Sequence, residues 1–296
     1  MTPDIDDATL ERACNRLARA LAPPAHAYVA LRVDSHAVGW IRADRMGRVA
    51  ACTGVFHVNS DGVAFLPSLR TAQQRSAAIA DVARELAAEG ALTAWRDERY
   101  AVAPAYGAPP SFDVERAAAR YFGVHTYAAH ANGLVREEGG VAMWIARRSP
   151  VKAIDPGLLD NLVGGGIAAG ATIADTVVKE AWEEAGIPAA LAARAHPAAP
   201  LHIRRDQPDG MQWETIFVHD LWLPADFVPA NQDGEAVEHR LVIAREAAAL
   251  VGNEVGGDVM TADASFVALD ALLRHAALAR RESWLARLAA LAQSGH

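Results

Sequence analysis

The sequence predicts an α+β chain built from two domains. Its 296 residues, of which 52% are hydrophobic, are enough to bury two separate cores. Segments with the strand period and segments with the helix period mix along the first 123 residues, and a second group of both kinds begins at residue 124. We therefore expect a smaller α+β accessory domain over residues 1–123 and a second domain over residues 124–296.

Composition narrows the kinds of partner that this chain can have. The formal net charge is −8, so a nucleic-acid surface has no bulk electrostatic support. Neither a signal peptide nor an apolar run long enough for a membrane span occurs. Cys14 and Cys52 match no disulfide or metal spacing and suit a reducing compartment. These observations favour a cytoplasmic protein with a small-molecule partner; they leave its oligomeric state open.

The first domain reads as short elements in succession. Leu10, Cys14 and Leu17 share one stripe of a helix that ends before Pro23. Asp61-Gly62 is a hairpin signal. The expected elements are a helix over 8–21, two strands around a turn over 28–42, further strand over 50–66, a helix over 70–89, a strand over 95–102 and a short helix over 113–122.

The second domain begins with two strands around a turn at Glu138-Gly139-Gly140. Residues 141–146 are almost all apolar, as in a strand that is buried on both faces. A further strand is expected over 215–223, and residues 241–251 and 264–291 read as largely helical.

The stretch from Gly164 to Ile187 joins a glycine turn to a short helix. Thr172 is placed to cap that helix, with Asp175 three residues on in a weaker form of the capping box, and Gly186 suits the residue after its end. The helix should therefore run over residues 173–185.

Three carboxylates lie within one sector of that helix. Glu180, Glu183 and Glu184 have spacings of three and four residues, while small apolar residues such as Ala181 and Ala185 fall on the other side. Like charges this close repel one another, so a stable helix of this kind suggests a compensating cation. Hard oxygen ligands suit Mg²⁺ or Mn²⁺. Taken alone, such a string is more often a solvated charged face.

The same stretch resembles the Nudix box. That pattern is Gly, five residues, Glu, seven residues, then Arg-Glu-aliphatic-any-Glu-Glu-any-Gly-aliphatic, and the chain has Gly165 and Lys179-Glu180-Ala181-Trp182-Glu183-Glu184-Ala185-Gly186-Ile187 in register with it. Two positions depart from the pattern: Ala171 replaces the first glutamate, and Lys179 replaces an arginine that orients a glutamate through its planar fork.

The resemblance extends to thiamine pyrophosphokinase-related Nudix hydrolases, which carry an extra domain ahead of the Nudix domain. The segments that carry it are 143–149, 156–161 and 231–235 in the second half and 38–42, 95–100 and 114–118 in the first. It implies a Nudix fold, a mixed sheet between helices, and Mg²⁺- or Mn²⁺-dependent hydrolysis of thiamine diphosphate or its oxidised analogues to the monophosphate plus orthophosphate. A nucleotide-sugar or dinucleotide pyrophosphohydrolase remains an alternative, as does a non-catalytic binding module, because Ala171 and Lys179 stand where the pattern has glutamate and arginine.

By position, the resemblance implies a metal site at the box glutamates. Glu180 and Glu184 match metal ligands, Glu183 either binds the metal or polarises the water, and the carbonyl of Gly164 or Gly165 completes the shell. A glutamate from a later loop joins them; Glu235 is the choice because it lies in the Asp233-Gly234-Glu235 turn, with Glu238 as runner-up, and either is also compatible with a plain solvated loop residue. The identity of the general base stays open.

Four basic residues complete the expected site. Arg147, Arg148 and Lys152 follow a buried strand and precede the glycine turn, where they can meet a diphosphate; the alternative is that one arginine faces solvent and the other pairs with an acidic neighbour. Lys179 is expected to hold a box glutamate, unless it is an ordinary exposed lysine. Trp213 is a candidate wall for an aromatic ring.

Overall fold

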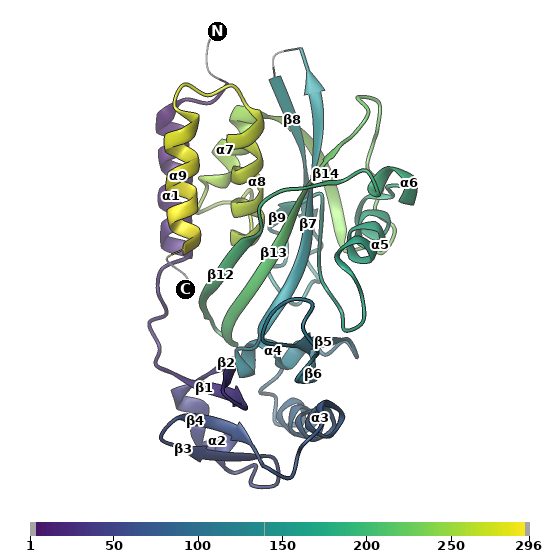
Figure 1. The fold of residues 1–296 in the computed structure, drawn as a ribbon. Coiled ribbons are helices and arrows are strands. Elements are labelled where there is room, and N and C mark those ends of the chain that lie inside the picture. Colours follow the sequence, from purple (N-terminus) through teal and green to yellow (C-terminus); the bar gives the residue numbers. More distant parts are fainter. Residues whose placement is uncertain (1–3, 139, 294–296) are drawn as a thin grey trace.

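The first half of the chain forms a small α+β unit with its own sheet, at the lower end of the molecule in Figure 1. The computed structural model describes residues 4–138 and 140–293. The four-stranded sheet of this first unit has the order β2-β1-β4-β3, with β1 parallel to β4. A separate hairpin, β5–β6, lies beside α3. The bounds are β1 Tyr28–Val33, β2 His36–Arg42, α2 Met46–Ala50, β3 Phe56–Asn59, β4 Gly62–Phe65, α3 Ala72–Ala88, β5 Arg99–Val102, β6 Phe112–Glu115 and α4 Ala119–Phe122.

Several expected elements of this unit are confirmed. The two strands over 28–42, the hairpin at Asp61-Gly62 and the helix over 70–89 are present. Thr71 caps α3 through a reciprocal pair of bonds with Gln74, which explains why the helix begins there. The core contains aliphatic and aromatic side chains from all of these elements: Leu31, Ile41, Phe56, Val63, Ile79, Leu86, Phe112 and Phe122.

Three expectations for this half were wrong in their bounds. Residues 113–122 are not one helix, because Phe112 and Val114 point into the core with the strand period before α4 begins. The strand expected from Trp95 starts only at Arg99, since Ala94 and Asp97 have φ of 61° and 56°, outside the extended region. The strand expected from residue 50 begins at Phe56, after a turn that follows α2.

The second half is built on an eight-stranded mixed sheet between helices, as expected. The main order is β11-β13-β7-β8-β14; β10 also pairs with β7, β12 with β13 and β9 with β8. β13 runs parallel to β7, and the other pairs are antiparallel. The bounds are β7 His125–Glu137, β8 Gly140–Arg148, β9 Leu159–Asn161, β10 Val163–Gly166, β11 His196–Pro197, β12 Leu201–Gln207, β13 Gly210–Trp222 and β14 Ala236–Ile243.

Two corrections concern this sheet. The glycines after Val163 belong to strand β10, so the expected glycine turn lies after them, before α5. Residues 241–243 belong to β14 rather than to a helix; Leu241 and Ile243 are exposed and their neighbours less so, which is the strand period. The turn expected at 138–140 includes Gly139, which lies outside the described residues.

Helices cover both faces of the sheet (Figure 1). α5 Ile173–Ala185 and α6 Ala189–Ala192 pack against one face, where Ala131, Val135 and Leu221 meet Ala181 and Ala185. α7 Ala244–Val251, α8 Ala262–His275 and α9 Arg281–Gln293 cover the other. β7 supplies both cores, because its side chains alternate between the faces. Among the described residues, no helix is long and apolar enough to cross a membrane.

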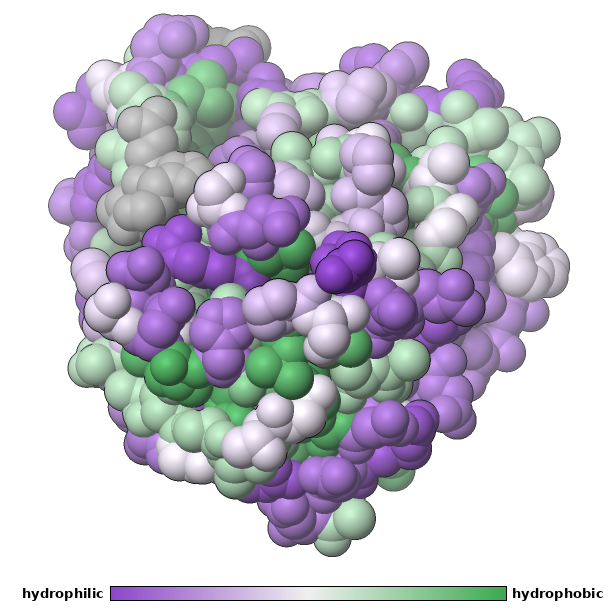
Figure 2. Space-filling model, turned by 60° about the horizontal axis from the view of Figure 1, so that its bottom comes forward, coloured by the Kyte–Doolittle hydropathy of each residue, from purple (hydrophilic) through white to green (hydrophobic). Residues whose placement is uncertain are grey.

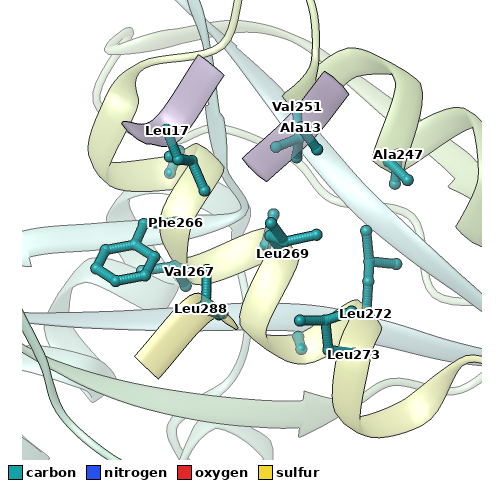
Figure 3. Packing of buried hydrophobic residues seen from close by; sticks show 14 of the residues in the cluster. Ala13, Leu17, Ala247, Val251, Phe266, Val267, Leu269, Leu272, Leu273 and Leu288 are labelled. Atoms are coloured by element: carbon teal, nitrogen blue, oxygen red, sulfur yellow. The ribbon is translucent and has the colours of Figure 1, made fainter. Parts of the chain in front are cut away.

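The first helix, α1 Asp7–Ala20, lies with the C-terminal helices rather than with the unit that follows it in sequence. Figure 3 shows Ala13 and Leu17 of α1 directed toward the same cluster as Val251, Phe266 and Leu288. Leu17 and Phe266 are fully buried there. The division into residues 1–123 and 124–296 stays a prediction, and in space α1 belongs to the core of the second part.

The two halves meet closely. Gly123 has φ of 57°, and a Cβ there would overlap the carbonyl oxygen of Trp40, so glycine is required where the chain passes from α4 into β7. Trp40 donates its backbone N–H to the Gly123 carbonyl at 3.0 Å, and Ala169 donates to the Arg99 carbonyl at 2.7 Å. Figure 2 shows the lower face of the molecule, where apolar residues lie between hydrophilic ones.

Candidate active site

A cavity of about 610 Å³ lies where the two halves meet. This volume is within the range of small-molecule sites, which favour domain junctions. Its walls come from the segment before β5, the start of β7, strand β10, the exposed turn of α5, the start of β13, the loop before β14 and the start of α8. The charged side chains in the wall include Arg96, Arg116, Arg148, Lys152, Lys179, Glu180, Glu183, Glu214, Glu235 and Asp263.

The acidic helix α5 begins and ends as its sequence predicts. The hydroxyl of Thr172 accepts from the N–H of Asp175, and the Asp175 carboxylate accepts from the N–H of Thr172 at 3.2 Å. Gly186 ends the helix with φ of 64°. Because both ends are fixed, the last two turns present Glu180 and Glu183 to the cavity.

The side chain of Glu180 packs against strand β10. A Cβ on Gly165 would lie 2.6 Å from the Glu180 Oε1 atom, which is closer than real Cβ contacts allow. The absence of a side chain at this position therefore lets the carboxylate rest against the strand. The side chain of Glu180 is only 16% exposed. Glu180 is therefore turned into the protein, whereas Lys179 and Glu183 on the same helix remain partly exposed.

Glu184 is the most deeply placed of the three glutamates and does not line the cavity. Its side chain is 12% exposed, and its Oε2 accepts from the Gly164 N–H at 2.8 Å. The ammonium of Lys152 lies 3.8 Å from its Oε1. Burial raises the pKa of Glu184 well above its ordinary value, and Lys152 offsets only part of this.

Lys179 joins the other two glutamates. Its Nζ donates to Glu180 at 3.0 Å and to Glu183 at 2.7 Å. Burial would lower the pKa of Lys179, yet these two hydrogen bonds raise it. Burial raises the pKa of Glu180, while Lys179 acts in the opposite direction. Lys179 therefore contacts box glutamates, as expected of the residue that replaces the arginine.

Among the expected basic residues, Lys152 and Arg148 line the cavity and Arg147 does not. The Arg147 guanidinium donates to Glu238 at 2.7 Å and to Asp258 at 2.5 Å, on the other side of β8. Arg148 donates to Asp160 at 2.6 Å. Both arginines therefore pair with carboxylates and neither faces solvent, which differs from the alternative left open from the sequence, and a substrate contact by Arg147 finds no support in this geometry.

Glu235, and not Glu238, is at the cavity. Its carboxylate lies between the ammonium of Lys152 and the guanidinium of Arg96, whose Nη1 is 2.9 Å away. Burial would raise the pKa of Glu235, but the two cations lower it to about 2. Glu238 pairs with Arg147 and Arg240 instead.

The first half contributes charged groups that the sequence did not reveal. Arg96, Arg99, Arg116 and Arg120 all line the cavity. Arg116 donates to Glu98 at 2.5 Å and lies near Glu180. The only local signal in the sequence was the run of four charged residues at 96–99, and nothing showed that it would meet α5.

Another part of the cavity wall is aromatic and polar. Trp213 lines it and stacks on His125, with ring centroids 4.5 Å apart and planes 4° from parallel. Gln212 donates to Glu214 at 3.0 Å and to Asp263 at 2.8 Å. A substrate in this cavity can therefore meet charged groups and an indole ring.

The donor set at α5 fits a hard divalent cation. Glu180 and Glu183 present carboxylate oxygens to the cavity, and Gly165 leaves room for one of them against the strand. The buried carboxylates with raised pKa values are also groups that a nearby cation would stabilise in their charged form. Within the described residues, no three His, Cys, Asp or Glu side chains already converge as a metal site, since lysines hold these carboxylates.

Fold and cavity together define an α+β protein with an acidic helix beside a cavity that carboxylates and basic side chains line. Comparison with known proteins agrees with this class. Residues 125–264 match the model of the NUDIX domain, and residues 8–126 match that of a domain of unknown function, DUF4743. The chain therefore carries a Nudix domain behind a DUF4743 domain, and Nudix domains generally use a divalent metal.

Two relatives from Arabidopsis thaliana are similar over most of the chain. Nudix hydrolase 20, chloroplastic, is 38% identical over 207 residues, which are 70% of this chain and 54% of the relative. Nudix hydrolase 24, chloroplastic, is 41% identical over 212 residues, which are 71% of this chain and 57% of the relative. The chain thus spans a little over half the length of these relatives.

Solved structures with a similar fold are more distant. DR0079 from Deinococcus radiodurans is 23% identical, with 48% of this chain and 80% of that chain covered and a TM-score of 0.36. A MutT NUDIX hydrolase from Burkholderia pseudomallei is 14% identical, with 49% and 95% covered and a TM-score of 0.35.

Proposed function

We propose that this chain is a Mg²⁺- or Mn²⁺-dependent pyrophosphohydrolase that cleaves a diphosphate linked to another group. The observation that supports this most is the cavity where Glu180 and Glu183 of α5 share a wall with basic side chains from both halves of the chain. A diphosphate carries several negative charges, and its hydrolysis requires cations around the phosphoryl oxygens. When bound, the divalent ion supplies further charge neutralisation and activates a water.

The residues of the chain have separate parts in this reaction. Lys152 and Arg148 lie at the same wall as Glu180 and Glu183, where they can bind phosphoryl oxygens. Glu180, Glu183 and Glu184 supply the carboxylates for the metal, with Glu235 on the loop above them. Hydrolysis forms a bond between a water oxygen and one phosphorus while the bridging P–O bond breaks, and each product leaves with one phosphate.

We infer that the substrate is thiamine diphosphate or an oxidised analogue, which gives the monophosphate plus orthophosphate. Trp213 supports this because it offers an indole surface in the same cavity as the basic residues. The cavity of about 610 Å³ suits a molecule with one diphosphate and two linked rings. A dinucleotide would require a longer groove with more phosphate contacts.

The decisive assay measures orthophosphate and monophosphate release across a panel of diphosphates, each with and without Mg²⁺. The panel contains thiamine diphosphate, its oxidised analogues, ADP-ribose and a dinucleotide polyphosphate. We expect a higher kcat/KM for the thiamine compounds than for ADP-ribose, and the reverse order rejects this substrate class. Binding of the panel without any metal-dependent release identifies a non-catalytic binding module instead.

A further inference from the structure

Arg96 belongs to the first half of the chain but reaches a loop of the second. Its Nη1 donates to Oε1 of Glu235 at 2.9 Å, and the ammonium of Lys152 pairs with the other oxygen, Oε2. Lys152, 9% exposed, lies 3.8 Å from Glu184. The four side chains therefore form a row of alternating charge, from Arg96 through Glu235 and Lys152 to Glu184 on α5.

The backbone of the Glu235 loop is fixed to α5 and β8. Ala230 N–H donates to the Ala185 carbonyl at 3.0 Å, and Gln232 N–H donates to the Glu183 carbonyl at 2.7 Å. Ser149 N–H donates to the Glu235 carbonyl at 2.8 Å. With the backbone held, the direction of the Glu235 carboxylate depends on the two cations that pair with it.

The segment that carries Arg96 is held in an unusual shape. Ala94 and Asp97, on either side of it, both have positive φ, a conformation that costs free energy in residues other than glycine. The N–H of Arg96 donates to the buried Glu115 carboxylate at 3.1 Å, and the Trp95 indole donates to Asp97 at 2.7 Å. These bonds fix the segment so that the Arg96 guanidinium points across the junction.

We propose that Arg96 is a positioning residue for the metal site: it holds the Glu235 carboxylate at the cavity, beside Lys152 and the carboxylates of α5. This rests on the proposed metal-dependent function and adds a role for the first domain within it. The direction in which the metal affinity changes when Arg96 is removed distinguishes a positioning role from a purely electrostatic one. Removal of a positive side chain by itself strengthens cation binding, whereas loss of the held carboxylate weakens it.

The test compares Mn²⁺ binding by isothermal titration calorimetry in Arg96→Ala, Glu235→Gln and the double variant. We expect Arg96→Ala to raise the Mn²⁺ Kd by about three- to tenfold, the range that one partly exposed charge-assisted hydrogen bond allows. The double variant should bind no more weakly than Glu235→Gln, because both changes remove the same carboxylate. Arg96→Lys, which keeps the charge, should recover part of the affinity.

Arg99→Ala is the matched control. Arg99 lines the same cavity from the same segment, but its nearest acidic partner is Asp113 at 4.0 Å and its side chain is 64% exposed. It should leave the Mn²⁺ Kd unchanged or lower it. An unchanged or lower Kd in Arg96→Ala, or effects of Arg96→Ala and Glu235→Gln that add, overturns the proposal.

A measurement without metal tests the positioning role of Arg96 separately from the proposed metal-dependent hydrolysis. The metal-free crystal structure of Arg96→Ala should show the Glu235 carboxylate displaced from its wild-type position, and that of Arg99→Ala should not, because the loop backbone stays held while the side chain loses one of its two cations. If the wild type binds no Mn²⁺ and hydrolyses nothing, the proposed function fails. If the Glu235 carboxylate keeps its wild-type position in metal-free Arg96→Ala, the positioning role fails.

Discussion

Gly165→Ala should impair catalysis while leaving the protein folded. A Cβ at this position would lie 2.6 Å from Oε1 of Glu180, whereas ordinary contacts begin near 3.4 Å. The Glu180 side chain must therefore move by roughly 1 Å, a displacement that can lower turnover on the order of 100-fold. The obstacle is the end of a flexible side chain and not backbone, so we expect less than about 1.5 kcal/mol of lost stability.

The measurement pairs kcat for the best diphosphate at saturating Mg²⁺ with the free energy of unfolding in guanidinium chloride. Gly47→Ala is the control, because a Cβ there would meet nothing within 4 Å. Gly123→Ala is the opposite case: its positive φ and its overlap with Trp40 should cost stability first. Wild-type kcat in Gly165→Ala would refute the role assigned to Glu180, and a stability loss as large as that of Gly123→Ala would refute the argument from side-chain flexibility.

Three further predictions follow from the same geometry. Glu184→Gln should lower metal-dependent turnover on the order of 1000-fold, because it removes a carboxylate from the proposed metal site. Ala171→Ser should leave kcat unchanged. Near-normal turnover of Glu184→Gln at saturating Mg²⁺ contradicts the assignment of Glu184 as a metal ligand. In metal-free protein the pKa values of Glu180 and Glu184 are raised, so these groups contribute stability below pH 4.5 that is lost as pH rises through the raised values. The gain in Tm on adding Mn²⁺ should therefore increase with pH. A gain that does not depend on pH contradicts this prediction. Leu17→Ala should destabilise the second domain by about 2–5 kcal/mol, since Leu17 is fully buried among α7, α8 and α9. A loss of stability that hydrogen exchange finds only in the first unit excludes this placement of α1.

The sequence predicts helix α1 but not the part of the molecule against which it packs. The stripe of Leu10, Cys14 and Leu17 correctly predicts a helix, because amphipathicity is a local property of the chain. It does not say which apolar surface that stripe will meet. The partner of α1 lies more than 200 residues away, and only the packed structure pairs them.

The site divides in the same way. Glycine spacing, the Thr172 cap and the run of glutamates are contained in one short stretch, so the acidic helix and its bounds could be predicted from the sequence. The cations around it could not. Arg147 and Arg148 are adjacent in sequence, yet one lines the cavity and the other pairs with Glu238 and Asp258, because neighbouring side chains of a strand point to opposite faces.

Local chemistry thus determined which residues of this protein form the acidic helix and which family pattern they resemble. The tertiary structure decided that Glu184 is buried while Glu180 and Glu183 face a cavity, and that Arg96 of the first domain reaches Glu235 of the second. Helix caps and periodicity depend on residues a few positions apart, whereas burial and ion pairing across 139 residues depend on how the two halves pack together.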